Sequence, residues 1–236
     1  MKHSNFLYFL LLIVSLNSCK DTKNTNFVVQ GTIKGLTKGT VFLDKVQDTL
    51  IVAIDSFKVR DNGHFILGEN IESPEIYYLR IKEIPNKKLL IFGEKSIIDI
   101  EAQLDKFDYS AKVTGSKNHE LLTTYKEMIQ QFKDAKLKLF KENLEAEKAN
   151  DKQTLDSLEI VFKRLNRRQY LYTTNFAVNN ADKEVAPYIA LTELYNAKLK
   201  LLDTINNALS EDIRNSKYGK QLDRFIAVIK KNEGVE

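Results

Sequence analysis

Residues 50–67 read LIVAIDSFKVRDNGHFIL, and this stretch decides the fold class. An apolar run rich in β-branched residues closes at Asp61, and a second apolar run begins at His64. Between them stands Asn62-Gly63, a strong hairpin signal because both residue types tolerate a positive φ. We therefore predict a β-hairpin with strands at 50–59 and 64–67.

Runs of the same kind lie on both sides of this hairpin. Phe27–Lys34 alternates apolar and polar residues, which is the period of a half-buried strand. Pro74, Pro85 and Gly93 separate further short runs, so that predicted strands also occupy residues 40–46, 76–81, 88–92, 97–102 and 111–114. Eight short strands at this spacing favour an antiparallel sandwich or barrel over a parallel sheet. We predict a β domain at 27–116.

The landmarks of this region resemble the bacterial domain-of-unknown-function 4369 family over residues 27–125. The resemblance implies a β domain that occurs on lipoproteins of Bacteroidota, followed by a helical region and often by a thioredoxin-like domain. This sequence reaches Glu236 without any Cys-x-x-Cys, and thiol–disulfide exchange requires an attacking thiolate, so that activity is not carried over. The residues that carry the resemblance are Phe27–Gly31, Gly35, Val41–Leu43, Asp55, Ser56, Asn62–Phe65, Tyr78, Phe92, Ile97–Ile100 and Val113–Ser116.

After residue 120 the pattern changes, and apolar residues recur in steps of three and four. Amphipathic stripes over 121–139 and 155–176 predict two helices, and Asn150–Asp151 is the expected turn of an antiparallel helical hairpin. The alternative is a coiled-coil surface for a partner. Because the stripes are short and contain Ala135 and Gln169, we favour a pair that packs on the sheet or on later helices.

The remaining chain predicts shorter helices. Pro187 suits the first turn of a third helix, Ser210 and Ser216 are expected N-caps, and we expect Lys230–Glu236 to fray. These helices form a C-terminal helical subdomain at 117–236. The predicted fold class is therefore α+β, with an N-terminal antiparallel β sandwich followed by the helical subdomain.

The N-terminus has the pattern of an export signal. Lys2 and His3 precede an uncharged apolar run over 6–16, which has the proportions of a signal-peptide core. The run ends in Leu16-Asn17-Ser18-Cys19, which resembles the lipobox of bacterial lipoproteins. We predict a signal peptide at 1–18, lipidation of Cys19, and a polar tether at 19–26. The alternatives are an uncleaved anchor helix and a plain secretory signal.

Lipidation would also define the surroundings of the protein. Cys19 is the only cysteine, so no thiol would remain for redox chemistry. Lys20 and Asp21 follow it, and charges at this place can mark surface export, whereas relatives with thioredoxin-like domains act in the periplasm. We expect an outer-membrane lipid anchor with the folded part facing the periplasm, and surface display is the alternative.

No constellation of catalytic or metal-binding residues stands out in the sequence. His64 and His119 are expected at the surface, and Asp99 and Glu101 are expected on one solvated sheet face, although they could form a carboxylate pair. Five aromatic residues are expected mainly in the core, with a hydrophobic groove as the alternative: Tyr77, Tyr78, Phe92, Phe107 and Tyr109.

Charge and composition narrow the function further. The net charge of +4 is spread along the chain with Lys and Glu interleaved, and no basic stripe points to nucleic acid. We predict a non-enzymatic binding or scaffolding module of the cell envelope, without cofactor or metal, that contacts an envelope protein partner. The alternative is an accessory component of periplasmic thiol–disulfide exchange that works with a separate thioredoxin-like partner. A hydrolase with dispersed carboxylates is a third hypothesis that no motif supports.

Overall fold

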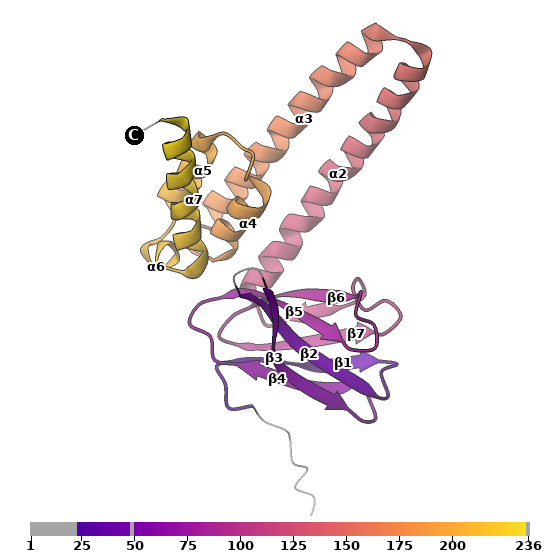
Figure 1. Cartoon of the computed structure of the whole chain (residues 1–236), viewed down its shortest axis with the longest axis vertical. Coiled ribbons are helices and arrows are strands. Elements are labelled where there is room, and N and C mark those ends of the chain that lie inside the picture. Colours follow the sequence, from indigo (N-terminus) through magenta and orange to yellow (C-terminus); the bar gives the residue numbers. More distant parts are fainter. Residues whose placement is uncertain (1–22, 48–49, 235–236) are drawn as a thin grey trace, which may run out of the picture.

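The computed structural model describes residues 23–47 and 50–234. Its N-terminal part is a sandwich of two four-stranded sheets and its C-terminal part is helical, which confirms the predicted α+β class (Figure 1). The predicted signal peptide and Cys19 lie outside the described residues. The strands are β1 (Phe27–Lys34), β2 (Gly39–Gln47), β3 (Leu50–Val59), β4 (His64–Glu69), β5 (Glu75–Ile81), β6 (Lys88–Gly93), β7 (Ile97–Gln103) and β8 (Lys112–Thr114).

The first sheet has the strand order β4-β1-β7-β8 and the second has the order β3-β2-β5-β6. Every paired strand runs antiparallel to its neighbour except β1 and β7, which are parallel. The predicted antiparallel sandwich is therefore confirmed as an antiparallel-rich one. Alternation along a strand fixes which side chains face the core, but it does not fix the direction of the neighbouring strand.

The predicted β-hairpin at 50–67 is wrong, although its turn at Asn62-Gly63 forms: β3 pairs with β2 and β4 pairs with β1, so the turn carries the chain from one sheet to the other. A turn signal predicts where the chain reverses, but it does not determine which strands pair. Gly63 has a φ of 75°, and a Cβ on it would lie 2.1 Å from the carbonyl oxygen of Ile33. Asn62 Oδ1 accepts a hydrogen bond from the backbone N–H of His64 over 3.2 Å. Only glycine fits this position, because the site requires both a positive φ and a close approach of another backbone.

The sandwich core lies between the two sheets and draws one alternating set of side chains from each strand. Leu43 and Tyr77 from the second sheet face Val29 and Ile100 from the first, and all four are fully buried. Each such side chain contributes about 1.5–3 kcal/mol through its removal from water. This core is what closes the β domain.

The helices are α2 (Lys117–Ala149), α3 (Lys152–Asn179), α4 (Val185–Glu193), α5 (Leu199–Ala208), α6 (Glu211–Arg214) and α7 (Lys217–Glu233). The predicted hairpin turn is confirmed, because Asn150 adopts the left-handed conformation between α2 and α3. The expected N-caps are confirmed as well: Ser210 accepts from the N–H of Ile213 and Ser216 from that of Gly219. The expected fraying is wrong up to Glu233, since α7 continues to that residue.

A second apolar core joins the helices to the sandwich. Ile76 on β5 and Phe92 on β6 point outward from the second sheet and pack among buried residues of the helices. Ile189 of α4, Leu202 of α5 and Leu222 of α7 are fully buried in the same cluster. The helical part is thus seated on one sheet face rather than joined by a loose linker.

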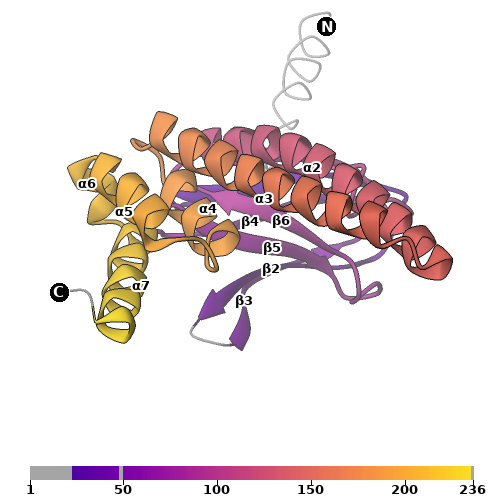
Figure 2. The same cartoon turned by 90° about the horizontal axis from the view of Figure 1, so that it is seen from above.

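The α2–α3 hairpin is much longer than the part of it that packs against the sandwich and the later helices. At 1.5 Å per residue, the 33-residue α2 is about 50 Å long. Its buried residues are Asn118, Leu122, Tyr125 and Ile129 near the base, and only Ala146 beyond them. Figure 2 shows α4–α7 gathered at one end of the hairpin, whereas the other end extends beyond them. We call residues 130–171 the arm. The prediction that the hairpin packs on the sheet or on later helices holds only for its base.

Candidate binding surface

The structure brings three of the sequence-predicted site residues to one face. Thr32 on β1 pairs with both His64 and Glu101, and Gln30 pairs with Asp99, so these side chains lie on the outer face of the first sheet. They line a shallow depression of about 560 Å³. His64, Asp99 and Glu101 are all exposed, and Gln30 Nε2 donates to Asp99 Oδ1 over 2.9 Å. The expected solvated sheet face is what forms here.

His119 occupies a different position from the one expected. It is half-buried, and its Nδ1 accepts a hydrogen bond from the backbone N–H of Phe92 over 3.3 Å. Burial lowers its pKa from 6.5 to about 4, with a further lowering from the neighbouring Lys126. The predicted surface role for His119 is therefore wrong: its neutral ring fastens the start of α2 to β6.

The aromatic residues form no common groove. Tyr77, Phe92 and Phe107 are fully buried, whereas Tyr109 is exposed. Tyr77 and Phe107 belong to the sandwich core, and Phe92 belongs to the core between the second sheet and the helices. Tyr78 is half-buried and packs against that second core, so core packing, which the sequence favoured, accounts for every one of the five except Tyr109.

The base of the hairpin is fixed by hydrogen bonds at the start of α2. Ser116 Oγ donates to the carbonyl of Phe92 over 2.7 Å and caps α2 by accepting from the N–H of His119 over 3.0 Å. The Glu94 carboxylate accepts from the N–H of Lys117 over 2.6 Å, where the positive end of the helix dipole favours an anion. The base of the hairpin therefore has a defined direction relative to the sandwich.

Asn118 extends this junction to α4. Its side-chain oxygen accepts from the N–H of Val185 over 2.9 Å, and its Nδ2 donates to Glu94 over 2.7 Å. Glu184 lies 3.4 Å from the same amide nitrogen, and burial raises the pKa of its carboxyl. One buried amide thus connects the β6–β7 turn, α2 and α4.

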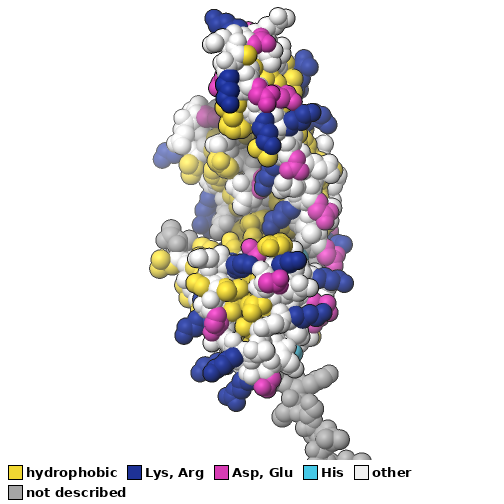
Figure 3. Space-filling model, turned by 90° about the vertical axis from the view of Figure 1, so that its right-hand side faces the viewer, with side chains coloured by type: hydrophobic (Ala, Val, Ile, Leu, Met, Phe, Trp, Pro, Cys, Tyr) yellow, Lys and Arg dark blue, Asp and Glu magenta, His cyan; other side chains and the backbone are white. Residues whose placement is uncertain are grey.

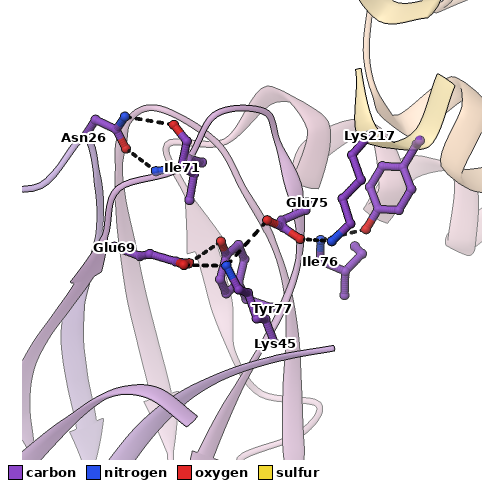
Figure 4. A network of polar contacts seen from close by, with 9 residues as sticks. Asn26, Lys45, Glu69, Ile71, Glu75, Ile76, Tyr77 and Lys217 are labelled. Atoms are coloured by element: carbon purple, nitrogen blue, oxygen red, sulfur yellow. Dashed lines mark hydrogen bonds and ion pairs between the residues drawn. The ribbon is translucent and has the colours of Figure 1, made fainter. Parts of the chain in front are cut away.

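A chain of alternating charges makes a second junction (Figure 4). Lys45 pairs with Glu69 and lies 3.8 Å from Glu75, which in turn pairs with Lys217 at the start of α7. Tyr77 Oη donates to Glu69 over 2.5 Å, and burial raises its pKa far above the ordinary value. Every charge in this network has an opposite partner, so the arrangement holds α7 to the sandwich.

The chain entering β1 is fastened beside this network. Asn26, the last residue of the predicted tether, exchanges two hydrogen bonds with the backbone of Ile71, over 2.8 and 2.9 Å. Lys23 Nζ lies 2.9 Å from Asp55 Oδ2 on β3.

Figure 1 shows the arm tip at the opposite end of the molecule from the point where the described chain begins.

The arm differs from the rest of the surface in its exposed apolar side chains. It contains 42 of the 210 described residues but seven of the fourteen large hydrophobic residues that are exposed among them. In Figure 3 hydrophobic atoms emerge between the charged side chains in the upper part of the molecule. The seven residues are between 39% and 59% exposed: Leu137, Phe140, Leu144, Ile160, Val161, Phe162 and Leu171.

Two grooves run along the arm, one on each side of Leu139 at the seam between the helices. The first has a volume of about 250 Å³ and lies between Phe140 and Phe162. Lys136 Nζ lies 5.9 Å from the centre of the Phe162 ring, which lines this groove. The second groove has a volume of about 430 Å³ and lies on the other side of Leu139.

The second groove combines an apolar floor with a basic rim. Ala135 and Leu165 form part of its floor, and Lys138, Arg164 and Arg168 stand along its edges. Its one carboxylate, Glu142, lies 3.9 Å from Lys138 Nζ. Sequence reasoning did not find this site, although the steps of three and four between Val161, Arg164 and Arg168 indicate a shared helix face.

The fold and the projecting arm define the class of this protein: a β sandwich that carries an α-helical hairpin on a hydrogen-bonded base. Residues 27–122 match the family described as domain of unknown function DUF4369, which confirms the resemblance, so the sandwich is a DUF4369 domain. The match includes the first residues of α2 and leaves the arm outside. Neither a curated protein nor a solved structure matches the chain.

Two further properties concern only residues 23–47 and 50–234. Within these ranges no helix is both long and apolar enough to span a bilayer. Over the same described residues, no group of three or more His, Cys, Asp or Glu side chains could hold a metal ion.

Proposed function

We propose that this protein is a lipid-anchored binding module of the cell envelope and that its arm holds a protein partner. The observation that carries the proposal is the exposure of seven large apolar side chains on the arm. Single exposed apolar residues are ordinary, whereas a concentration of them on one element is typical of interaction sites. Covering such side chains releases about 25 cal/mol for each Å² of apolar surface removed from water.

The hydrogen bonds at the base of the hairpin support a binding role for the arm. Ser116, Asn118 and His119 hold the start of α2, and Tyr125 Oη is 2.8 Å from Thr173 Oγ1 across the hairpin. A surface held in place before binding loses less conformational entropy when a partner docks. The arm can therefore present its side chains without first having to fold.

The groups with strongly shifted pKa values support a non-enzymatic role. His119 and Tyr218 each accept a hydrogen bond from a backbone N–H, that of Phe92 for the former and that of Ile76 for the latter. Burial raises the pKa of Tyr218 and lowers that of His119. Perturbed groups can mark catalytic sites, but these two are engaged in joining elements of the fold.

The position in the envelope is part of the same proposal. A lipid on Cys19 would hold the chain at the outer membrane, and the folded part would face the periplasm. Protease added to intact cells should leave the protein whole until the outer membrane is permeabilised. Degradation on intact cells would favour surface display instead.

The alternative function is an accessory role in periplasmic thiol–disulfide exchange. The DUF4369 match supports this alternative, because the family resemblance implies relatives that carry a thioredoxin-like domain. In that case the partner on the arm would itself carry a Cys-x-x-Cys. Identification of the bound partner therefore decides between a general scaffold and this redox accessory.

Affinity enrichment from crosslinked envelope tests the proposal with the full chain. The arm variant carries Leu137→Gln, Phe140→Gln and Phe162→Gln, and the control carries Tyr195→Gln and Val228→Gln, which remove exposed apolar side chains outside the arm. We expect a protein that copurifies with the parent and the control but not with the arm variant. Equal enrichment by all three, or no enriched protein, would contradict the proposal.

A further inference from the structure

The groove bounded by Arg164 and Arg168 has a chemical character that the rest of the arm lacks. Its cationic side chains stand one turn apart on α3, with Lys138 opposite them on α2. Within the described residues neither arginine takes part in an ion pair. Like charges at this spacing destabilise a helix by a few tenths of a kcal/mol when no anion lies between them.

Apolar surface accompanies these charges. Val161 lines the groove and is 44% exposed, and Leu165 lies one turn further along α3. Ile160 and Leu171 are exposed on the same helix, 52% and 43% respectively. A complementary ligand must therefore carry both an apolar strip and carboxylates. An apolar ligand would leave the arginines unpaired, and an anion alone would leave the apolar side chains exposed to water.

We propose that this groove binds an acidic amphipathic helix of a partner protein. The apolar face of that helix covers Val161 and Leu165, and its carboxylates pair with Arg164 and Arg168. Planar guanidinium groups donate two parallel hydrogen bonds to a carboxylate, and amphipathic helices commonly dock their apolar face in hydrophobic grooves. This inference rests on the proposed function and adds to it the side of the arm and the chemistry of the partner.

Protein is favoured over the other anionic ligands by the composition and position of the groove. A nucleic-acid phosphate backbone could pair with the arginines, but it would leave the apolar floor formed by Ala135 and Leu165 uncovered. A lipid surface would suit a basic apolar face, but the arm tip lies at the opposite end of the molecule from the point where the described chain begins (Figure 1). An anchor on that side would hold the groove away from its own membrane.

Site-specific photocrosslinking in the native envelope tests the assignment. The photoreactive residue p-benzoylphenylalanine replaces Val161 in the full chain, and parallel chains carry it in place of Phe140, in the opposite groove, or Val228, exposed on α7. We expect the adduct at position 161 to map to a segment with apolar residues at helical spacing and Asp or Glu beside them. A lipid, a nucleic acid or a second copy of this chain at that position would overturn the proposal.

Charge reversal makes the test specific for the arginines. Arg164→Glu with Arg168→Glu should lower the adduct yield at position 161 at least about tenfold, because two close charge pairs become repulsive. The matched control is Lys220→Glu with Arg224→Glu, two exposed cations at the same spacing on α7, and it should leave the yield unchanged. An unchanged yield after reversal of the arginines would overturn the assignment.

The control positions separate failure of this inference from failure of the proposed function. If position 140 captures a partner and position 161 does not, the arm binds through its other groove and only the present inference fails. If neither position captures more protein than position 228, both fail. Circular dichroism of each variant confirms that the fold is retained, which is expected because the substituted side chains are exposed.

Discussion

The backbone N–H of Phe92 on β6 donates a hydrogen bond to Nδ1 of His119 on α2, over 3.3 Å. This contact requires the neutral imidazole, because a protonated Nδ1 would turn a donor toward a donor. Burial around the ring disfavours the charged form in the same direction and lowers its pKa to about 4. The base of the hairpin is therefore joined to the sandwich by a hydrogen bond that is sensitive to acid.

A pH dependence of stability follows. The unfolded chain binds a proton at His119 near pH 6.5 and the folded chain only near 4, so this contribution is fully present above pH 6.5 and is lost as pH falls toward 4. We expect the free energy of unfolding in urea to fall by roughly 1–3 kcal/mol over this range from His119 alone. His119→Asn keeps an acceptor near Nδ1 without a titration, so the pH dependence should flatten. A parallel dependence in both proteins would contradict this.

The buried pair between Asp44 and Arg80 gives a second prediction. The Asp44 side chain is fully buried, and Arg80 Nε lies 2.6 Å from its Oδ2 while Nη2 lies 3.1 Å from Oδ1. Arg80→Met leaves the carboxylate without its partner and should lower the free energy of unfolding by about 3–5 kcal/mol. Adding Asp44→Leu should restore most of the loss, because an apolar pair needs no charge compensation. The contrary result is a free energy of unfolding for Arg80→Met within about 1 kcal/mol of the parent value, which is on the order of the effect of a surface substitution. In that case the pair does not stabilise this region.

The proposed lipid anchor gives a prediction at the N-terminus. Mass spectrometry of the mature protein should find an acylated Cys19, and Cys19→Ala should accumulate as unprocessed precursor in the inner membrane. The reason is that the thiol is the group to which the diacylglyceryl chain would be attached. An unmodified mature end that begins at another residue would refute lipidation.

Much of the fold could be predicted because it depends on local patterns. The Asn62-Gly63 turn, the Ser116–Asn118 boundary between sandwich and helices, and the turn at Asn150 are each encoded by short-range chemistry. The parallel pairing of β1 with β7 could not be predicted, since a period of two gives the faces of a strand but not its neighbour. Asp44 reads as an ordinary polar residue, and only the register shift after Leu43 and the position of Arg80 explain its burial.

The candidate binding surface was predicted only in part. Amphipathic stripes indicate which side of each helix faces the other, as Leu139 and Leu165 do. They do not indicate where support from later helices ends, because that depends on where α4 and α5 pack along α3. The exposure of Phe140 and the rim of arginines are therefore properties of the tertiary structure, even though their spacing is visible in the sequence.

The affinity of the purified full chain for the partner it captures tests the central claim most directly. Isothermal titration calorimetry compares the parent, the variant with Leu137→Gln, Phe140→Gln and Phe162→Gln, and the control with Tyr195→Gln and Val228→Gln. We expect the arm variant to bind at least about 30-fold more weakly, a loss of about 2 kcal/mol, and to unfold within about 0.5 kcal/mol of the parent because the replaced side chains are exposed. Equal dissociation constants for all three proteins would contradict a binding role for the arm.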